Sequence, residues 1–217
     1  MLRRNAFCFE DLTMKLERID VNSQLLHWKE ILDQWVYLNK EIFSCSNGNF
    51  AAYSYRERPN IGVMAGAAVK AGWVALEECW SQKEGFLGAK DIYHGRADLW
   101  LWRGVQHERI EAKFTTDGFS ELKYKIKRRH ESAKNDAAKL GTSLNGRNIA
   151  LTFIVPRVRH DEKDDFEKSA IELMNHCMDL SPLIFASVFP GWVPRLGADK
   201  KEKDKYAMGV VVIGDIV

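Results

Sequence analysis

This chain has little that points to metal–sulfur chemistry or to a disulfide framework. Its four cysteines are Cys8, Cys45, Cys79 and Cys177. They are scattered, with no C-x-x-C pair and no histidine at zinc-ligand spacing. We therefore expect plain thiols and no structural zinc site.

Long apolar runs are also missing. No run approaches the roughly 20 residues that a membrane-spanning helix needs. Residues 1–8 include basic side chains but no apolar stretch and no small-residue cleavage site. We expect a cytoplasmic protein without a membrane partner.

The 217 residues suffice for one domain with a sizeable core, and the net charge of +2 is too small to imply a polyanionic partner by itself.

Several enzyme signatures are absent as well. The chain has no Gly-rich phosphate-binding loop, no G-x-S-x-G elbow and no H-E-x-x-H pair. It also has no internal repeat. Enzymes of those classes therefore find no support in the sequence.

The N-terminal region contains an amphipathic pattern between Asn22 and Phe43. Apolar residues recur there at steps of three and four, which is typical of a helix with one buried face. A segment rich in turn formers, residues 45–49, ends the pattern. We therefore predict an N-terminal helical extension over residues 1–50 and a second region over residues 51–217. Trp28 and Trp35 lie on the apolar stripe, which packs in the core or contacts a partner chain.

A second helix is predicted from near Pro59 to Ala71, with Gly72 as its stop. Residues 73–80 are interpreted as a strand, although the spacing of Trp73, Leu76 and Trp80 also suits a continued helix. Residues 81–95 are interpreted as a polar connection. Two strands follow, one through Asp98 and one through Glu111, with Gly104 closing the hairpin between them.

A basic helix is predicted from Phe119 to Leu140, capped by Thr116 or Asp117. Its inward stripe is Phe119, Leu122, Ile126, Ala133 and Ala137. The other faces carry an excess of four positive charges between Glu121 and Lys139. Arg129 falls on the inward stripe, so its side chain either reaches out of the core or extends toward a functional site.

The remaining segments predict a strand over 149–155, a helix over 161–178, a strand over 183–189 and a last strand over 207–214. The helix should bury Phe166, Ala170, Leu173 and Cys177. Two strand–helix–strand units after a three-stranded meander indicate an α/β fold, a central mixed β-sheet flanked by helices.

Two carboxylates and a lysine interrupt the apolar pattern of the hairpin. Ile110, Ala112 and Phe114 alternate with polar residues, so Glu111 and Lys113 lie on the same face of their strand. Carboxylates from neighbouring strands, here Asp98 and Glu111, suit a hard cation such as Mg²⁺. Solvent-facing charges on an amphipathic strand are the alternative.

The order of elements, with Asp98 in the second strand and Glu111-Ala112-Lys113 in the third, resembles the PD-(D/E)XK nuclease superfamily, whose fold is restriction endonuclease-like. The resemblance covers residues 51–217. It implies a catalytic Lys113 and a metal, Mg²⁺ or Mn²⁺, held by Asp98, Glu111 and the backbone carbonyl of Ala112. It also implies in-line hydrolysis that leaves a 5′-phosphate and a 3′-hydroxyl. Ala97 departs from the motif's proline at a position that supplies no ligand.

Members of this superfamily often add a glutamate from the helix that precedes the sheet. Glu57, at the start of the second predicted helix, is our candidate for this metal ligand. Its alternative role is a favourable acid near a helix N-terminus. Glu77 or Glu78 would replace it if residues 61–80 formed one unbroken helix, and the helical wheel then favours Glu77.

The basic helix offers a surface for DNA phosphates or is simply a solvated face. The residues that would bind nucleic acid are Lys123, Lys127, Arg128, Arg129 and Lys134. His94, just before the Asp98 strand, is close enough to the site to participate or is structural.

We therefore expect a metal-dependent nuclease that hydrolyses DNA phosphodiester bonds, in a restriction, phage-defence, mobile-element or repair context. A homodimer would be compatible with cutting two strands. The competing hypothesis is a non-catalytic nucleic-acid or protein interaction module on the same fold.

Overall fold

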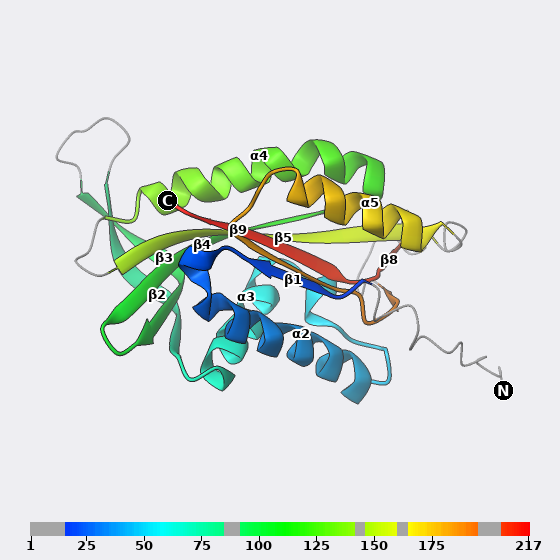
Figure 1. Cartoon of the computed structure of the whole chain (residues 1–217), viewed down its shortest axis with the longest axis horizontal. Coiled ribbons are helices and arrows are strands. Elements are labelled where there is room, and N and C mark those ends of the chain that lie inside the picture. The colour runs from blue at the N-terminus through cyan, green and yellow to red at the C-terminus, as the bar shows by residue number, and fades with distance from the viewer. Residues whose placement is uncertain (1–15, 85–91, 142–145, 160–164, 195–204) are drawn as a thin grey trace.

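The computed structural model describes residues 16–84, 92–141, 146–159, 165–194 and 205–217 (Figure 1). The helices are the short 3-10 turns η1 (Ser23–Leu25) and η2 (Ala52–Ser54), and α2 (His27–Cys45), α3 (Glu57–Lys70), α4 (Phe119–Ala138) and α5 (Phe166–Met178). The strands are β1 (Arg18–Val21), β2 (Val74–Glu84), β3 (Ile92–Arg103), β4 (Gln106–Asp117), β5 (Gly146–Arg159), β6 (Ile184–Val188), β7 (Val193–Pro194), β8 (Lys205–Ala207) and β9 (Val210–Ile216).

The strands form a mixed, open sheet in the order β1-β6-β9-β5-β4-β3-β2. The pair β4–β5 is parallel and the other neighbours along this path are antiparallel. Strand β8 pairs with the end of β5, and β7 pairs with β8. Helices α4 and α5 cover one face of the sheet and α2 and α3 cover the other (Figure 1). The predicted α/β class, with a mixed sheet flanked by helices, is confirmed.

The core on the α2 and α3 side unites the N-terminal helix with the sheet. Trp28, Leu32 and Trp35 of α2 are fully buried in one cluster with Met64 of α3 and Phe153 of β5. The Trp stripe therefore packs within the chain. The division at residue 50 stays a prediction, although α2 shares this core with the strands.

The core on the other face lies under α4 and α5. Leu122 and Ile126 of α4 pack there with Phe185 of β6 and Val211 of β9. The predicted inward residues of α5, namely Phe166, Ala170, Leu173 and Cys177, are all buried. Helix α4 buries one residue that the apolar stripe did not include, His130.

The first hairpin differs from the prediction in length. Strand β2 runs to Glu84 and β3 begins at Ile92, and the two pair from Val74 opposite Trp102 to Glu84 opposite Ile92. The expected polar connection over 81–95 is therefore wrong for its described residues. Backbone pairing in this two-stranded ribbon extends the strands through polar residues. His94 lies in β3, opposite Gln82.

Helix α3 ends at Lys70, and Gly72 follows with a φ of +82°. Since glycine adopts this left-handed conformation without strain, it stops the helix and turns the chain into β2. The strand interpretation of residues 73–80 is confirmed and the unbroken helix is wrong. Glu77 and Glu78 therefore belong to a strand and are not helix carboxylates.

Two other boundaries were wrong. Asp117 is the last residue of β4, so Gly118 occupies the cap position of α4 and neither Thr116 nor Asp117 caps it. The last predicted strand is divided into β8 and β9. The break falls at Met208 and Gly209, where a Cβ on Gly209 would lie 2.4 Å from the carbonyl oxygen of Val188.

Strands β1 and β7 were not predicted, since they have only four and two residues. Within the described parts of the chain, no helix is both long and apolar enough to cross a membrane.

Candidate active site

The candidate site lies along the edge of β4 where β3 leaves it. The β3–β4 pairing begins at Leu99 opposite Ile110, and if this register continued by one residue Asp98 would lie opposite Glu111. Asp98 Oδ2 instead accepts a hydrogen bond of 2.7 Å from the backbone N–H of Ala112. Both backbone groups of a strand residue point to the same edge. The carbonyl of Ala112 is therefore directed toward the side that carries Asp98.

Glu57 occupies the next position along this edge. It is the first residue of α3, and its carboxylate accepts a hydrogen bond from the backbone N–H of Phe114. Burial, and then the nearby negative charge of Asp98, raise the pKa of Glu57 above its ordinary value, while the charges of Lys113 and Arg129 oppose this shift. Asp98 and Glu57 thus accept hydrogen bonds from alternate backbone N–H groups of β4, and their negative charges repel each other.

Glu111 and Lys113 lie on the face of β4 that α4 covers. Lys113 Nζ lies 2.8 Å from Asp136 Oδ2 of α4, and alternation along the strand places Glu111 on the same face. Glu111 is buried and Lys113 is half-buried. Burial alone would lower the pKa of Lys113, but Asp136, Glu111 and Glu57 outweigh it and raise that pKa. The ammonium therefore stays charged at neutral pH.

The predicted metal ligands thus lie on or beside one stretch of β4, from Glu111 to Phe114. Asp98, Glu111 and Glu57 supply carboxylate oxygens, and Ala112 adds a carbonyl, which is the ligand type that Mg²⁺ and Mn²⁺ prefer. The mutual repulsion of Glu57 and Asp98 is what a bound cation would relieve, so the donor set fits such an ion. Among the described residues, no three His, Cys, Asp or Glu side chains already converge as a metal-binding group.

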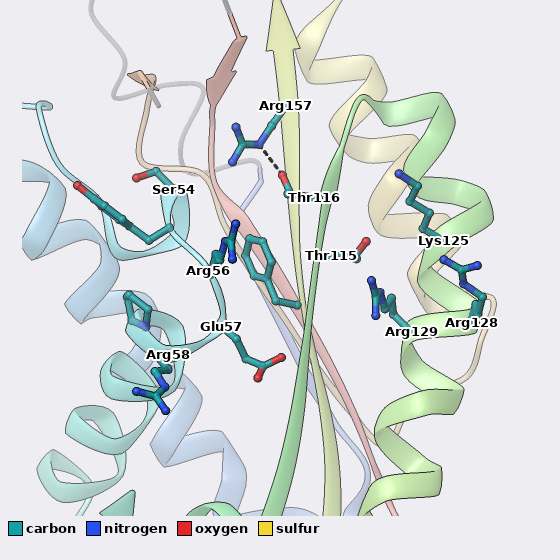
Figure 2. A pocket seen from close by; sticks show the side chains of 13 residues that line it. Ser54, Arg56, Glu57, Arg58, Thr115, Thr116, Lys125, Arg128, Arg129 and Arg157 are labelled. Carbon is teal, nitrogen blue, oxygen red and sulfur yellow. Dashed lines mark hydrogen bonds between the residues drawn. The ribbon is translucent and has the colours of Figure 1, made fainter. Parts of the chain in front are cut away.

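A cleft of about 1120 Å³ opens beside Glu57, between the start of α3 and helix α4, with Phe114, Thr115 and Thr116 of β4 among its lining residues. Figure 2 shows Glu57 extending toward β4 from the α3 side, with Lys125, Arg128 and Arg129 on α4 across the strand. Among the described residues, the cleft is lined by one acid, Glu57, and by six basic side chains: Arg56, Arg58, Lys125, Arg128, Arg129 and Arg157.

The structure divides the predicted nucleic-acid-binding residues. Arg128 and Arg129 line the cleft, and Arg129 also lowers the pKa of Glu57. Arg129 is exposed, so its expected place on the inward stripe was wrong, and its side chain lines the cleft. Lys127 is exposed on α4 outside the cleft. Lys123 pairs with Glu172 of α5 at 3.2 Å, and Lys134 bonds Asp215 of β9 at 3.2 Å, so both face other partners.

Four of the basic side chains that line the cleft were missed. Arg56 and Arg58 flank Glu57 in the sequence, and Lys125 belongs to the basic helix. The sequence therefore showed these positive charges, but it did not show that their side chains line the cleft. Arg157 lies near the end of β5, where its Nε donates a hydrogen bond of 2.7 Å to Thr116 Oγ1. Only the parallel pairing of β4 and β5 brings it to the cleft, and no local pattern indicates that.

The two remaining candidates lie on β2, where Glu77 pairs in register with Leu99 and Cys79 with Ala97, so that Glu78 falls opposite Asp98. Glu78 forms ion pairs with Arg58 at 3.0 Å and Arg96 at 3.3 Å, and Glu77 is exposed on β2.

Comparison with known proteins adds no relative: no family model, no curated protein and no solved structure matches this chain.

Proposed function

We propose that the protein is a metal-dependent nuclease that hydrolyses DNA phosphodiester bonds, on a fold of the restriction endonuclease-like kind. The observation that supports this function is the position of three carboxylates and a charged lysine on or beside β4, next to a cleft lined with arginines. Carboxylates alone would suit many metal sites. The adjoining positive cleft favours a polyanionic substrate, since lysine and arginine neutralise backbone phosphates.

The residues have distinct roles in this proposal. Asp98, Glu111, Glu57 and the carbonyl of Ala112 would hold Mg²⁺ or Mn²⁺. When bound there, such an ion would lower the pKa of a water molecule and offset negative charge that develops on the scissile phosphate.

Lys113 keeps a positive charge beside these carboxylates. An ammonium in that state does not abstract a proton, and it can stabilise charge on the phosphate oxygens or hold the attacking water. Arg56 and Arg129, on opposite sides of β4 next to Glu57, would bind the phosphates that flank the cut (Figure 2).

Cleavage of labelled DNA with Mg²⁺ or Mn²⁺ tests this function. We expect the wild-type protein to cut, and we expect Asp98→Ala, Glu111→Ala and Lys113→Ala each to reduce the rate by at least about 100-fold. Each variant should keep the wild-type circular dichroism spectrum.

The matched control is Asp33→Asn, which removes an exposed acid that pairs with Lys29 on α2 at 3.0 Å. Its cleavage rate should equal that of the wild type. Failure of the wild type to cut single- or double-stranded DNA with either metal would contradict the proposal. DNA binding without cutting or metal uptake would instead support the interaction module.

A further inference from the structure

Lys113 forms an ion pair with Asp136, whose carboxylate is not one of the proposed metal ligands. Asp136 Oδ2 lies 2.8 Å from Lys113 Nζ, and Asp136 Oδ1 lies 2.8 Å from Lys139 Nζ. The two oxygens thus bind two different lysines. Lys139 follows three residues after Asp136 at the C-terminal end of α4, so this second contact fixes the orientation of the carboxylate relative to Lys113.

The helix that carries Asp136 is firmly attached to the sheet. Ala133 and Ala137, on either side of Asp136 along α4, are fully buried against Ala150 of β5. His130 of α4 also contacts the sheet through a hydrogen bond, since its Nε2 lies 3.0 Å from Asp215 Oδ2 on β9. Asp136 therefore presents its carboxylate from a rigid element, which is what precise placement of a neighbouring group requires.

Glu111 lies two residues before Lys113 on the same face of β4, and Glu57 is near enough for its charge to raise the pKa of Lys113. The charges of Glu111 and Glu57 both act on its ammonium, and a flexible lysine side chain released from Asp136 would move toward them. An ammonium bonded to those carboxylates would occupy the oxygens that the cation needs. It would also no longer face the phosphate.

We propose that Asp136 is a positioning residue, which holds the Lys113 ammonium beside the carboxylates Glu111 and Glu57 and keeps it from binding them. This inference rests on the proposed nuclease function. Asp136 itself touches neither the metal ligands nor the substrate in this account, and it acts through Lys113 alone.

Steady-state DNA cleavage and Mn²⁺ calorimetry test the inference. Asp136→Asn should lower kcat about tenfold with KM for DNA within about twofold, since a small displacement of a catalytic group affects mainly the chemical step. It should also weaken Mn²⁺ binding about threefold, because the freed ammonium competes for the carboxylates. Asp136→Glu, which keeps the negative charge, should restore most of the kcat and most of the Mn²⁺ affinity.

A double-mutant cycle shows whether the effect passes through Lys113. In a Lys113→Met background, Asp136→Asn should change neither the residual rate nor Mn²⁺ affinity. The matched control is Glu172→Gln, which frees another α4 lysine, Lys123, from an acid on α5. Its kcat should stay at the wild-type level.

The outcomes separate the two proposals. An active wild type with an unchanged Asp136→Asn variant, or a loss that persists in the Lys113→Met background, would overturn the positioning role and leave the nuclease function intact. A wild type that neither cuts DNA nor binds Mn²⁺ would overturn the nuclease function and this inference with it.

Discussion

Glu57 illustrates the conflict between stability and function at the scale of one residue. Its carboxylate is half-buried at the start of α3, close to Asp98. Burial and this like charge raise the pKa of Glu57. A raised carboxyl pKa means that the ionised form destabilises the folded protein at every pH above the pKa of the unfolded chain. A local cost of this kind is common where a site is built to bind a cation.

Glu57→Gln should therefore stabilise the metal-free protein while impairing metal binding. The glutamine carbonyl can still accept the hydrogen bond from Phe114, and the repulsion from Asp98 is gone. We expect the melting temperature to rise by about 1–2 °C at pH 7, a small gain because solvent screens the half-exposed group. The gain should shrink as the pH falls through the raised pKa of Glu57 and should vanish below the ordinary glutamate pKa of about 4.3, where this carboxyl is protonated in both states.

Differential scanning fluorimetry with and without Mn²⁺ measures both effects. Glu77→Gln, a change at an exposed acid of β2, is the control and should leave the melting temperature as it is. A lower melting temperature for Glu57→Gln at pH 7 would contradict the proposed repulsion.

At the scale of elements, a buried polar network joins α4 to the sheet. His130 Nδ1 lies 3.1 Å from Thr152 Oγ1 of β5, and its Nε2 lies 3.0 Å from Asp215 Oδ2 of β9. Lys134 donates to the same oxygen, and Asp215 Oδ1 accepts from the backbone N–H of Leu183. This network fixes the helix that supplies Asp136 and three of the basic side chains that line the cleft, Lys125, Arg128 and Arg129.

Asp215→Ala should destabilise the protein by about 2–3 kcal/mol, because it leaves buried donors without their acceptor. Burial alone would raise the pKa of Asp215, but the hydrogen bonds from His130, Leu183 and Lys134 outweigh it and lower that pKa. The ionised carboxylate therefore stabilises the fold above the unfolded pKa, and this contribution is lost as the pH falls through the lowered folded pKa.

Urea denaturation at several pH values checks this prediction. The difference in unfolding free energy between the wild type and Asp215→Ala should be largest near pH 7 and should shrink below about pH 4. A difference that is independent of pH would contradict the assigned role of the charge. Asp33→Ala, at an exposed position of α2, should cost less than about 0.5 kcal/mol.

The elements also show which features local sequence determines. The stripes of α2 and α5 were predictable because apolar spacing of three and four residues follows directly from helix geometry. His130 was not, since it is polar and its burial depends on Thr152 and Asp215 from other strands. The length of the β2–β3 ribbon depends on backbone pairing, which polar side chains do not reveal.

The site was predictable to a similar extent. Asp98, Glu111, Lys113 and Glu57 came from motif spacing and element order. In the structure Asp98 and Glu57 accept hydrogen bonds from backbone N–H groups of β4, the strand that carries Glu111 and Lys113. The contact of Lys113 with Asp136 depends on how α4 packs over β4, and that of Asp98 with Ala112 depends on where β3 leaves β4. No spacing along the chain encodes either arrangement.

At the scale of the whole molecule, charge is concentrated although the chain is nearly neutral. The net charge is +2, yet six basic residues and one acid of the described part of the chain line a single cleft. These basic residues come from the start of α3, from α4 and from β5, and only folding brings them around one cleft. The basic helix contributes Lys125, Arg128 and Arg129, while its other cations pair elsewhere or face solvent.

DNA binding should therefore depend on salt through the cleft. In EDTA, Arg56→Gln and Arg129→Gln should each weaken binding and reduce the slope of log affinity against log salt concentration by about one. Lys29→Gln, an exposed change on α2, should leave the slope as it is. Fluorescence anisotropy of labelled oligonucleotides at several salt concentrations measures this. Equal slopes for all four proteins would show that DNA does not enter the cleft.

The central claim is that one divalent cation binds between Asp98, Glu111 and Glu57. A crystal soaked with Mn²⁺ tests it most directly, because anomalous scattering locates the ion without reference to activity. We predict an anomalous peak within about 2.2 Å of carboxylate oxygens of Asp98 and Glu111, with Glu57 and the carbonyl of Ala112 beside it, and no peak in Glu111→Ala crystals. No peak at saturating Mn²⁺, or a peak held by other residues, would contradict the account.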